Sequence, residues 1–204
     1  MPRKFGEIAF TPEVKAAQEQ RGSRQTYEKY IVNGADNNTI TPKIAELIAQ
    51  LDGFYLGTVS SSGYPYIQFR GGSLGFLKVL DKKTLGFADF AGNVQYITIG
   101  NLSGNNKAFL FLMDYRHRKR IKIWGRAEFI EGDAQLIERL RVPGYSAEIE
   151  RVILFHVEAT SENCPQHIPM RYSETEVEQM LAPLRDRIAQ LEQQLSQHEG
   201  VRLC

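Results

Sequence analysis

The sequence predicts a mainly β (α+β) protein: an antiparallel β-barrel with flanking helices and a C-terminal coiled-coil-like helix. Three patterns indicate this class. Short runs rich in aromatic and β-branched residues, separated by glycine-containing turns, begin at Phe54. Before them, Thr11-Pro12 and Thr41-Pro42 are cap-then-proline helix starts. After Ser173, apolar residues recur at alternating spacings of four and three.

Six or seven strands are expected, enough for a closed or nearly closed antiparallel barrel. The first two form a hairpin that turns at Gly63. The expected strands are Phe54–Ser60, Tyr64–Arg70, Gly75–Leu80, Thr84–Ala88, Lys107–Met113, Lys119–Ile130 and Val152–Thr160.

Two helices are expected among the strands. One opens over Asn93–Ile97, where poor helix propensity means that tertiary contacts must hold it. The other covers Asp133–Arg141 and ends at a Pro-Gly pair. The domain organisation predicted is therefore a helical arm (1–40), a barrel (41–170) and a C-terminal helix (171–204).

The C-terminal helix has the clearest signals. Ser173 and Glu176 form a capping-box pair, and Pro183 is expected to kink or weaken the helix. Its role is subunit contact or packing against its own barrel. The apolar seam, about three heptads long, consists of Val177, Leu181, Leu184, Ile188, Leu191 and Leu195.

Composition narrows the function classes. The formal charge of +1 gives no global field that would attract nucleic acid or a membrane. Two cysteines, Cys164 and Cys204, make neither a disulfide framework nor a metal spacing, and the histidines show no metal-binding pattern. No stretch approaches the roughly 20 apolar residues of a membrane span. We therefore expect a cytoplasmic protein without a metal, a nucleic-acid partner or a membrane partner.

The strand Tyr64–Arg70 separates its side chains by type. Period-two geometry puts Tyr66, Gln68 and Arg70 on one face, and Pro65, Ile67 and Phe69 on the other. A glycine pair follows and would let a ligand or backbone come close. The alternative is a solvated strand face that ends in a bulge.

Three further segments are candidates for binding. The turn Asp89–Tyr96 leads into a helix start, where an anion such as phosphate is favoured, although spacing alone favours an ordinary Asn-capped helix. Lys122 and Arg126 flank the single tryptophan on an amphipathic strand and could meet a ligand phosphate or a partner subunit. The loop Cys164–His167 mixes nucleophilic and titratable groups, with a proline-stiffened connector as the alternative.

Taken together, the segments 54–72, 85–96 and 100–102 resemble the pyridoxamine 5'-phosphate oxidase-like family of FMN-binding split barrels, over about residues 40 to 170. The resemblance implies FMN as cofactor and a homodimer with the flavin at the subunit interface. It also implies a set of cofactor-binding residues: Gln68, Phe69, Arg70, Asp89, Asn93, Gln95, Tyr96, Asn101, Leu102, Lys122, Arg126, Cys164, Gln166 and His167.

The sequence departs from the pyridoxamine oxidase at the phosphate turn. That enzyme carries adjacent basic residues there, whereas this chain reads Asn93-Val94-Gln95. Phosphate charge must then be met by Arg70, Lys122 or Arg126, and pyridoxamine phosphate is not the expected substrate.

The function expected is that of an FMN-dependent oxidoreductase that exchanges hydride or electrons with a nicotinamide, a small organic substrate or oxygen. His167 is its expected proton donor. The alternatives are a non-catalytic flavin or haem carrier or sensor, and a relative that uses deazaflavin or haem.

Overall fold

The computed structural model describes residues 3–35, 37–162 and 165–201, with side chains described as far as residue 196. The chain divides into two compact units. The first contains Met1–Asp114 and Lys119–Gln166, and the second contains Tyr115–Arg118 and His167–Cys204. None of the helices in the described part of the chain is long and apolar enough to cross a membrane.

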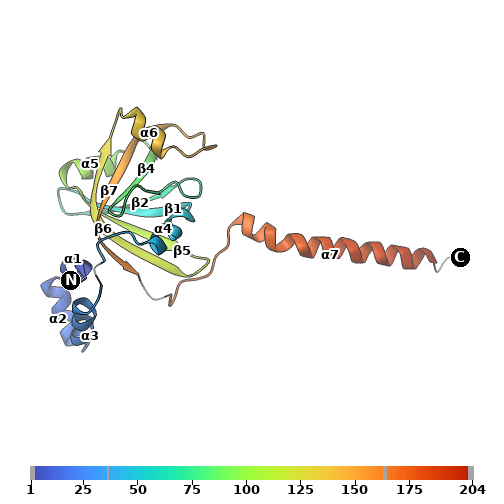
Figure 1. Cartoon of the computed structure of the whole chain (residues 1–204), viewed down its shortest axis with the longest axis horizontal. Helices are drawn as coiled ribbons and strands as arrows, with labels where there is room; N and C mark the ends of the chain where they lie inside the picture. The colour runs from blue at the N-terminus through green and yellow to red at the C-terminus, as the bar shows by residue number, and fades with distance from the viewer. Residues whose placement is uncertain (1–2, 36, 163–164, 202–204) are drawn as a thin grey trace. The chain divides into compact units, whose positions relative to one another are not determined.

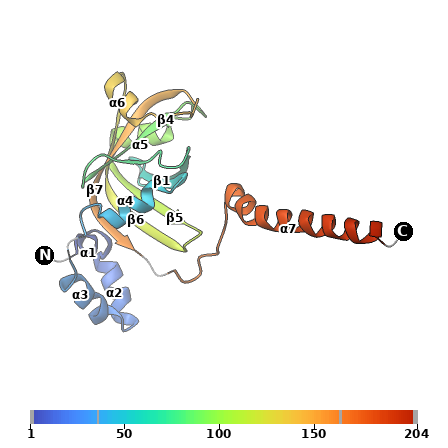
Figure 2. The ribbon, with the colours of Figure 1, turned by 45° about the vertical axis from the view of Figure 1, so that its right-hand side comes forward.

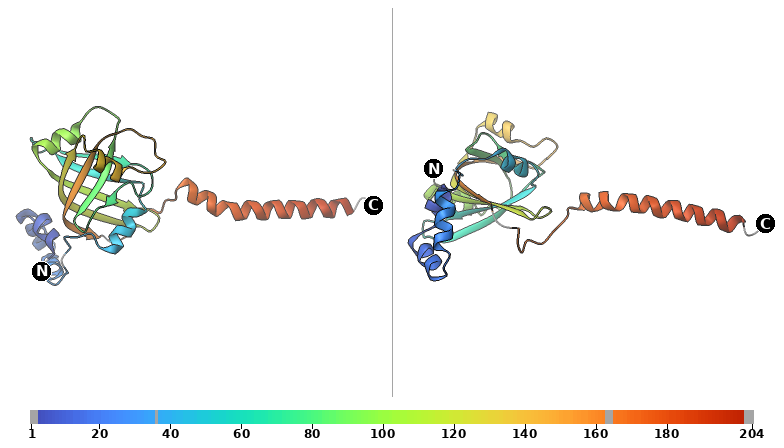
Figure 3. Two further views of the ribbon diagram at one scale, coloured as in Figure 1. Left: turned by 45° about the horizontal axis from the view of Figure 1, so that its top comes forward. Right: turned by 60° about the horizontal axis from the view of Figure 1, so that its bottom comes forward.

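Seven strands in the described residues form one antiparallel sheet, in the order β2-β1-β5-β6-β7-β4-β3. The sheet curls around its own core as a split barrel (Figures 1 and 3). The strands are β1 Gly53–Val59, β2 Pro65–Gly71, β3 Lys78–Val79, β4 Thr84–Phe90, β5 Lys107–Asp114, β6 Lys119–Ile130 and β7 Ile149–Glu162. All seven predicted strands are therefore present, with β3 much shorter than the predicted run.

The two cap-then-proline helix starts are confirmed. The Thr11 hydroxyl accepts a hydrogen bond from the backbone N–H of Val14, and Thr41 does the same for Ile44. Each satisfies one of the N–H groups left free at a helix start. The helices are α1 Lys4–Ala9, α2 Pro12–Gln20, α3 Arg24–Val32, α4 Pro42–Ala49, α5 Ile97–Gly104, α6 Ala134–Leu140 and α7 Glu174–Val201.

The core fills the barrel interior. Phe54 stacks on Phe76 with ring centroids 5.5 Å apart and meets Phe87 edge-on at 5.1 Å. All three are fully buried, and burial of each ring stabilises the fold by about 1.5–3 kcal/mol. The inner faces of β5 and β6 and the apolar side of α4 complete this cluster. Figure 2 shows α6 at the end of the barrel near β4 and β7.

The N-terminal arm packs against the outer face of the sheet. Phe5 on α1 lies 5.8 Å from Trp124 on β6, ring centroid to ring centroid, and is itself buried. On the other side of Trp124 lies Phe109, at 5.1 Å. The tryptophan between Lys122 and Arg126 therefore has an aromatic neighbour from the arm.

In the second unit, α7 begins at the predicted capping box. The Ser173 N–H donates to the Glu176 carboxylate at 2.8 Å, and the Glu176 N–H donates to the Ser173 hydroxyl at 3.3 Å. The helix continues through Pro183 to Val201, so this proline does not end it.

Candidate functional site

The edge strand β2 turns its polar face inward. Gln68 pairs with Leu56 and Arg70 with Phe54, both of which are core residues of β1. Directly paired residues share a face, so Gln68 and Arg70 lie on the interior side. The apolar face points outward, where Ile67 is 68% exposed and Phe69 58% exposed.

Two paired glycines, Gly71 at the end of β2 and Gly53 at the start of β1, make room for a side chain of the protein. A Cβ on Gly71 would lie 2.8 Å from the Phe69 ring, and a Cβ on Gly53 would lie 2.3 Å from it. The ring of Phe69 therefore crosses the β1–β2 pair over two glycines. The predicted close approach exists, but a side chain of the same strand makes it.

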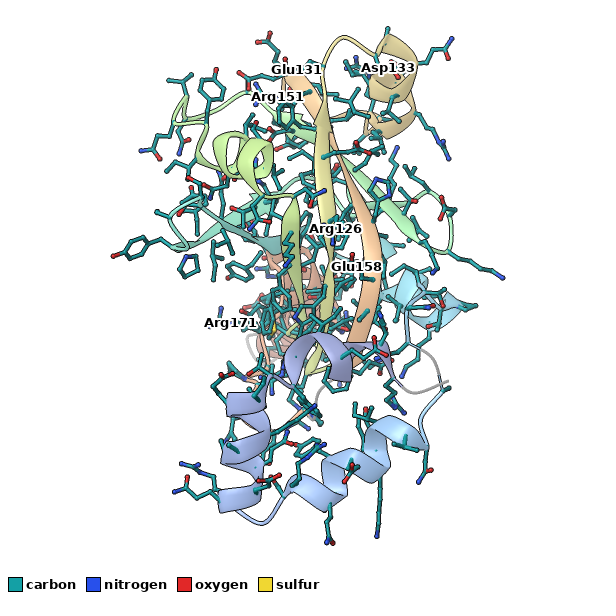
Figure 4. All side chains as sticks on the ribbon, turned by 90° about the vertical axis from the view of Figure 1, so that its left-hand side faces the viewer. Arg126, Glu131, Asp133, Arg151, Glu158 and Arg171 are labelled. Carbon is teal, nitrogen blue, oxygen red and sulfur yellow. The ribbon has the colours of Figure 1, made fainter. Side chains whose placement is uncertain are left out.

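A buried charge cluster joins two strands that are not neighbours in the sheet. Arg70 on β2 donates to Asp89 on β4, and Arg151 on β7 donates to the other oxygen of Asp89 at 3.3 Å. Arg151 also pairs with Glu131 at 3.0 Å and Glu150 at 2.8 Å. Figure 4 shows Arg151 close to Glu131. The Arg70–Asp89 pair thus spans the split of the barrel.

Burial governs the titration of this cluster. It raises the pKa of the Asp89 carboxyl above the ordinary value, and the charges of Arg70 and Arg151 offset this only in part. For Arg151, burial alone would lower the pKa, but the hydrogen bond that it donates to Glu131 and the charges of Asp89 and Glu150 raise it. The cluster therefore keeps the Arg151 guanidinium charged.

The helix α5 begins later than predicted. Asn93 does not cap it; the N-cap is Tyr96, which has left-handed backbone angles (φ 52°, ψ 22°) and makes no capping hydrogen bond with its side chain. This conformation is strained for a bulky residue. The Tyr96 ring lies 5.3 Å from the Arg151 guanidinium, and its hydroxyl is 3.5 Å from Glu150. These two contacts hold the turn.

Two side-chain hydrogen bonds dock α5 on the sheet. The Thr98 hydroxyl donates to the Gln68 amide oxygen at 2.9 Å, and the Asn101 amide donates to the Thr58 hydroxyl at 3.0 Å. Leu102 is buried in the core. Asn101 and Leu102 do not line the pocket described next, and their assignment as cofactor contacts stays a prediction.

An open pocket lies between β2, β4, the turn before α5 and the start of β7. Its empty volume, including solvent at the mouth, is about 450 Å³. Five of the sequence-predicted site residues line it, namely Gln68, Arg70, Asp89, Asn93 and Tyr96. The sequence analysis missed Thr98, Glu150 and Arg151, which also line it. Gln95 is exposed and is not among the lining residues.

The basic side chain of Lys122 on β6 points to the outer face of the sheet, opposite to the pocket. Lys122 pairs with Phe111, Phe111 with Tyr55, and Tyr55 with Phe69. This row is the outward one, so one chain does not bring Lys122 to the side of Gln68 and Arg70.

The two predicted cations of that strand differ in their surroundings. Arg126 donates to Glu158 and to Asn106, at 2.8 and 2.9 Å, and Figure 4 shows Arg126 beside Glu158. Lys122 has no carboxylate partner among the described residues, and burial together with Arg120 lowers its pKa. The Nε of Arg120, on the same face of β6, is buried and has no hydrogen-bond partner among the described residues.

The predicted C-terminal segment is only partly described. Cys164 lies outside the described residues, and Gln166 is exposed. His167 belongs to the second unit and has a positive φ of 62°. Contact between these residues and a cofactor stays a prediction. No cluster of three metal-ligating side chains occurs within 3–35, 37–162 and 165–196.

Comparison with known families identifies the barrel. Residues 40–167 match the family model described as pyridoxamine 5'-phosphate oxidase. This range includes every strand of the sheet and the whole pocket lining. Among curated proteins, no sequence matches the chain.

Several solved structures are similar to this chain at low sequence identity. HupZ of Group A Streptococcus is 21% identical, with a TM-score of 0.50, over 65% of this chain and 99% of HupZ. An FMN-binding protein of Syntrophomonas wolfei is 17% identical, with a TM-score of 0.46, over 72% of this chain and 97% of that protein. The haem storage protein HutZ of Vibrio cholerae is 15% identical, with a TM-score of 0.41, over 60% and 93%. The likeness to HupZ shows a common fold.

Proposed function

This chain belongs to the pyridoxamine 5'-phosphate oxidase family, and from that premise we propose that its β2–β4–α5 pocket binds the phosphate end of FMN. We further propose that the protein is a flavin-dependent oxidoreductase acting on a small molecule, as a homodimer with the flavin at the subunit interface.

The observation that carries the proposal is an unsatisfied donor in the pocket wall. The Nε of Arg70 is buried and has no hydrogen-bond partner among the described residues. A buried donor left unpaired costs about 1–3 kcal/mol. An anionic oxygen would satisfy it while the Nη1 of Arg70 stays on Asp89. The residues present therefore fit a phosphate group.

Charge balance supports a second subunit at the site. In the pocket, Arg70 and Arg151 face Asp89 and Glu150, so the positive charge is already matched. Lys122, a cation that has no carboxylate partner among the described residues, lies on the other face of the sheet. Two copies, with the outer face of one against the pocket of the other, would add that cation to the site.

The protein's part in the proposed reaction is positioning. FMN supplies hydride and electron transfer when bound. Arg70 would hold the phosphate. The Gln68 amide, oriented by Thr98, would keep its N–H₂ group free to donate to a ligand.

The deciding experiment is an absorption spectrum of the freshly purified protein, followed by heat release and mass identification of the bound molecule. We expect flavin bands and released FMN. A Soret band would show that the protein binds haem instead of flavin. A colourless protein that does not bind added FMN would contradict the proposal. Bound FMN without turnover with any nicotinamide or small-molecule donor would leave a flavin carrier.

Variants test the pocket itself. Arg70→Gln removes the charge and the buried Nε donor, and we expect the dissociation constant for FMN to rise by about tenfold or more, as for loss of a charged hydrogen bond. Arg141→Gln is the matched control, because Arg141 forms only an exposed pair with Glu138. Equal dissociation constants for FMN in both variants would show that Arg70 does not bind the phosphate. Thermal unfolding of each shows whether the fold is intact.

His167→Ala tests the proposed proton donor. We expect turnover to fall while the flavin content stays unchanged, because a proton donor acts in the reaction and not in cofactor binding. Unchanged turnover would remove His167 from the mechanism and leave the flavin site standing.

A further inference from the structure

The helix α7 carries a continuous apolar seam that its own unit leaves open. Its six residues alternate spacings of four and three, and their exposed fractions lie between 36% and 63%. A stripe this narrow is typical of a coiled-coil contact rather than of packing against a globular core. The residues are Val177, Leu181, Leu184, Ile188, Leu191 and Leu195.

We propose that this seam forms a parallel, two-stranded, in-register coiled coil with α7 of a second copy of this chain. The spacing puts Leu181, Ile188 and Leu195 at heptad position a, and Val177, Leu184 and Leu191 at position d. A β-branched residue at a with leucine at d favours two strands. Ile188, with Leu184 and Leu191 beside it, has this combination.

Charged side chains beside the seam select the second copy and the parallel orientation. Arg187 is at position g, and Glu192 is at position e of the next heptad, five residues later. In a parallel pair, g of one helix faces the following e of the other. The twofold axis would then create two Arg187–Glu192 pairs. Within the described part of the chain, neither residue makes an ion pair, since Arg187 donates only to Gln190.

The antiparallel arrangement brings g against g and e against e, so it does not place Arg187 opposite Glu192. The g positions are Met180, Arg187 and Gln194, which include no acidic residue. Arg185 and Glu178, both at e, already pair along the same helix at 2.6 Å.

Pro183 does not interrupt the seam. It lies at position c, on the side of the helix away from a and d. The carbonyl that loses its partner is that of Gln179, at position f, where water can hydrogen-bond it. The expected weakening by proline therefore falls on the solvent side. A coiled coil of only three heptads is marginally stable by itself. A dimer formed through the barrels would raise the effective concentration of one α7 helix near the other. The α7 contact does not depend on the proposal that the protein binds flavin.

Disulfide trapping in the full chain tests the contact. In a background with Cys164→Ser and Cys204→Ser, Leu191→Cys places one thiol at d, next to its copy in a parallel in-register pair. We expect a covalent dimer under mild oxidation. The matched control is Gln193→Cys at position f, which points away and should stay monomeric on a denaturing gel. Equal crosslinking of both variants, or none with Leu191→Cys, overturns the proposal.

A crosslinking experiment with two different cysteine variants distinguishes a parallel from an antiparallel helix pair. In an antiparallel pair that aligns all six seam residues, Leu191 faces Leu181, so a mixture of Leu191→Cys and Leu181→Cys chains would crosslink better than Leu191→Cys alone. That result overturns the parallel arrangement. A chain that sediments as a dimer but does not crosslink through Leu191→Cys overturns the helix contact and leaves the barrel dimer intact.

Charge reversal supplies a second test in the Leu191→Cys background. Arg187→Glu would place two pairs of like charges across the seam, and we expect the crosslinking rate at low salt to fall about fivefold. The double change Arg187→Glu with Glu192→Arg restores both attractive pairs and should restore the rate. Failure of this rescue overturns the assigned register.

Discussion

Asp89 is where burial and charge compete most directly. Its carboxylate is 5% exposed and contacts two guanidinium groups, yet burial still raises its pKa. The ion pair with Arg70 links the two edges of the split barrel, but burial of the charged Asp89 carboxylate costs free energy. Such a pair is expected where it fixes geometry rather than where it maximises stability.

The Asp89→Asn variant tests this balance. The pKa of an aspartate in the unfolded chain is about 3.9. Because the pKa of Asp89 is higher in the folded state, the folded state binds more protons between these two values, and stability falls as the pH rises through that interval.

We expect the free energy of unfolding of the native protein, minus that of Asp89→Asn, to decrease from below pH 4 upward and then level off. Urea unfolding at a series of pH values measures it. A difference that grows with pH would show that the attraction of Arg70 and Arg151 outweighs burial.

Single residues were predictable where they lie close together in sequence. Alternation in β2 identified Gln68 and Arg70, and the turn after β4 identified Asn93 and Tyr96. Arg151 lies 62 residues after its partner Asp89 and reaches it only because β4 pairs with β7. No short sequence pattern shows that β4 pairs with β7. A charged residue at the start of an apolar run, here Arg151 before Val152, was the available signal.

Among the elements, β6 contains a β-bulge that requires a glycine at position 125. The register with β7 shifts between Trp124 and Gly125. A Cβ on Gly125 would lie 2.1 Å from the His156 carbonyl oxygen and 2.6 Å from the Phe155 ring. The bulge brings the backbones too close for any side chain.

We therefore expect Gly125→Ala to lower the free energy of unfolding by roughly 3 kcal/mol or more, as overpacking against backbone does. Gly57→Ala in β1 is the control, since its Cβ would meet its nearest neighbour at an ordinary 3.5 Å. Urea unfolding compares the two. Similar losses in both variants would mean that the cost is that of any alanine in a strand.

Elements with strong local signals were predicted well, and those held by distant contacts were not. The capped helices α2, α4 and α7 begin where their caps lie. The start of α5 was misplaced because Tyr96 is held by Arg151 and Glu150, which belong to β7. The face of β2 that looks apolar in sequence turned out to be the exposed one.

For the whole molecule, that exposed face is the feature that most needs a partner. Ile67 and Phe69 lie on an edge strand, with Tyr55 beside them on β1. Aromatic and aliphatic side chains gathered on an open edge mark a contact surface. The proposed barrel dimer would cover it.

Ile67→Lys tests that dimer. A buried, unpaired ammonium on each side of the twofold axis should raise the dimer dissociation constant at least about tenfold, and FMN occupancy should fall with it. Val32→Lys on α3 is the control, because Val32 has a similar exposed fraction, 64% against 68%. Sedimentation at several concentrations gives both constants. A dimer unaffected by Ile67→Lys would place the contact elsewhere.

The strand order also dictates the sequence of events during synthesis. In the finished sheet, β4 is joined only to β3 and β7, and β7 is the last strand to leave the ribosome. Strands β1, β2, β5 and β6 can pair as soon as residue 130 emerges. Until residues 149–162 follow, β4 lacks the strand that joins it to the rest of the sheet. A chain arrested before Ile149 thus consists of one open sheet and a detached hairpin, a form prone to associate with other nascent chains.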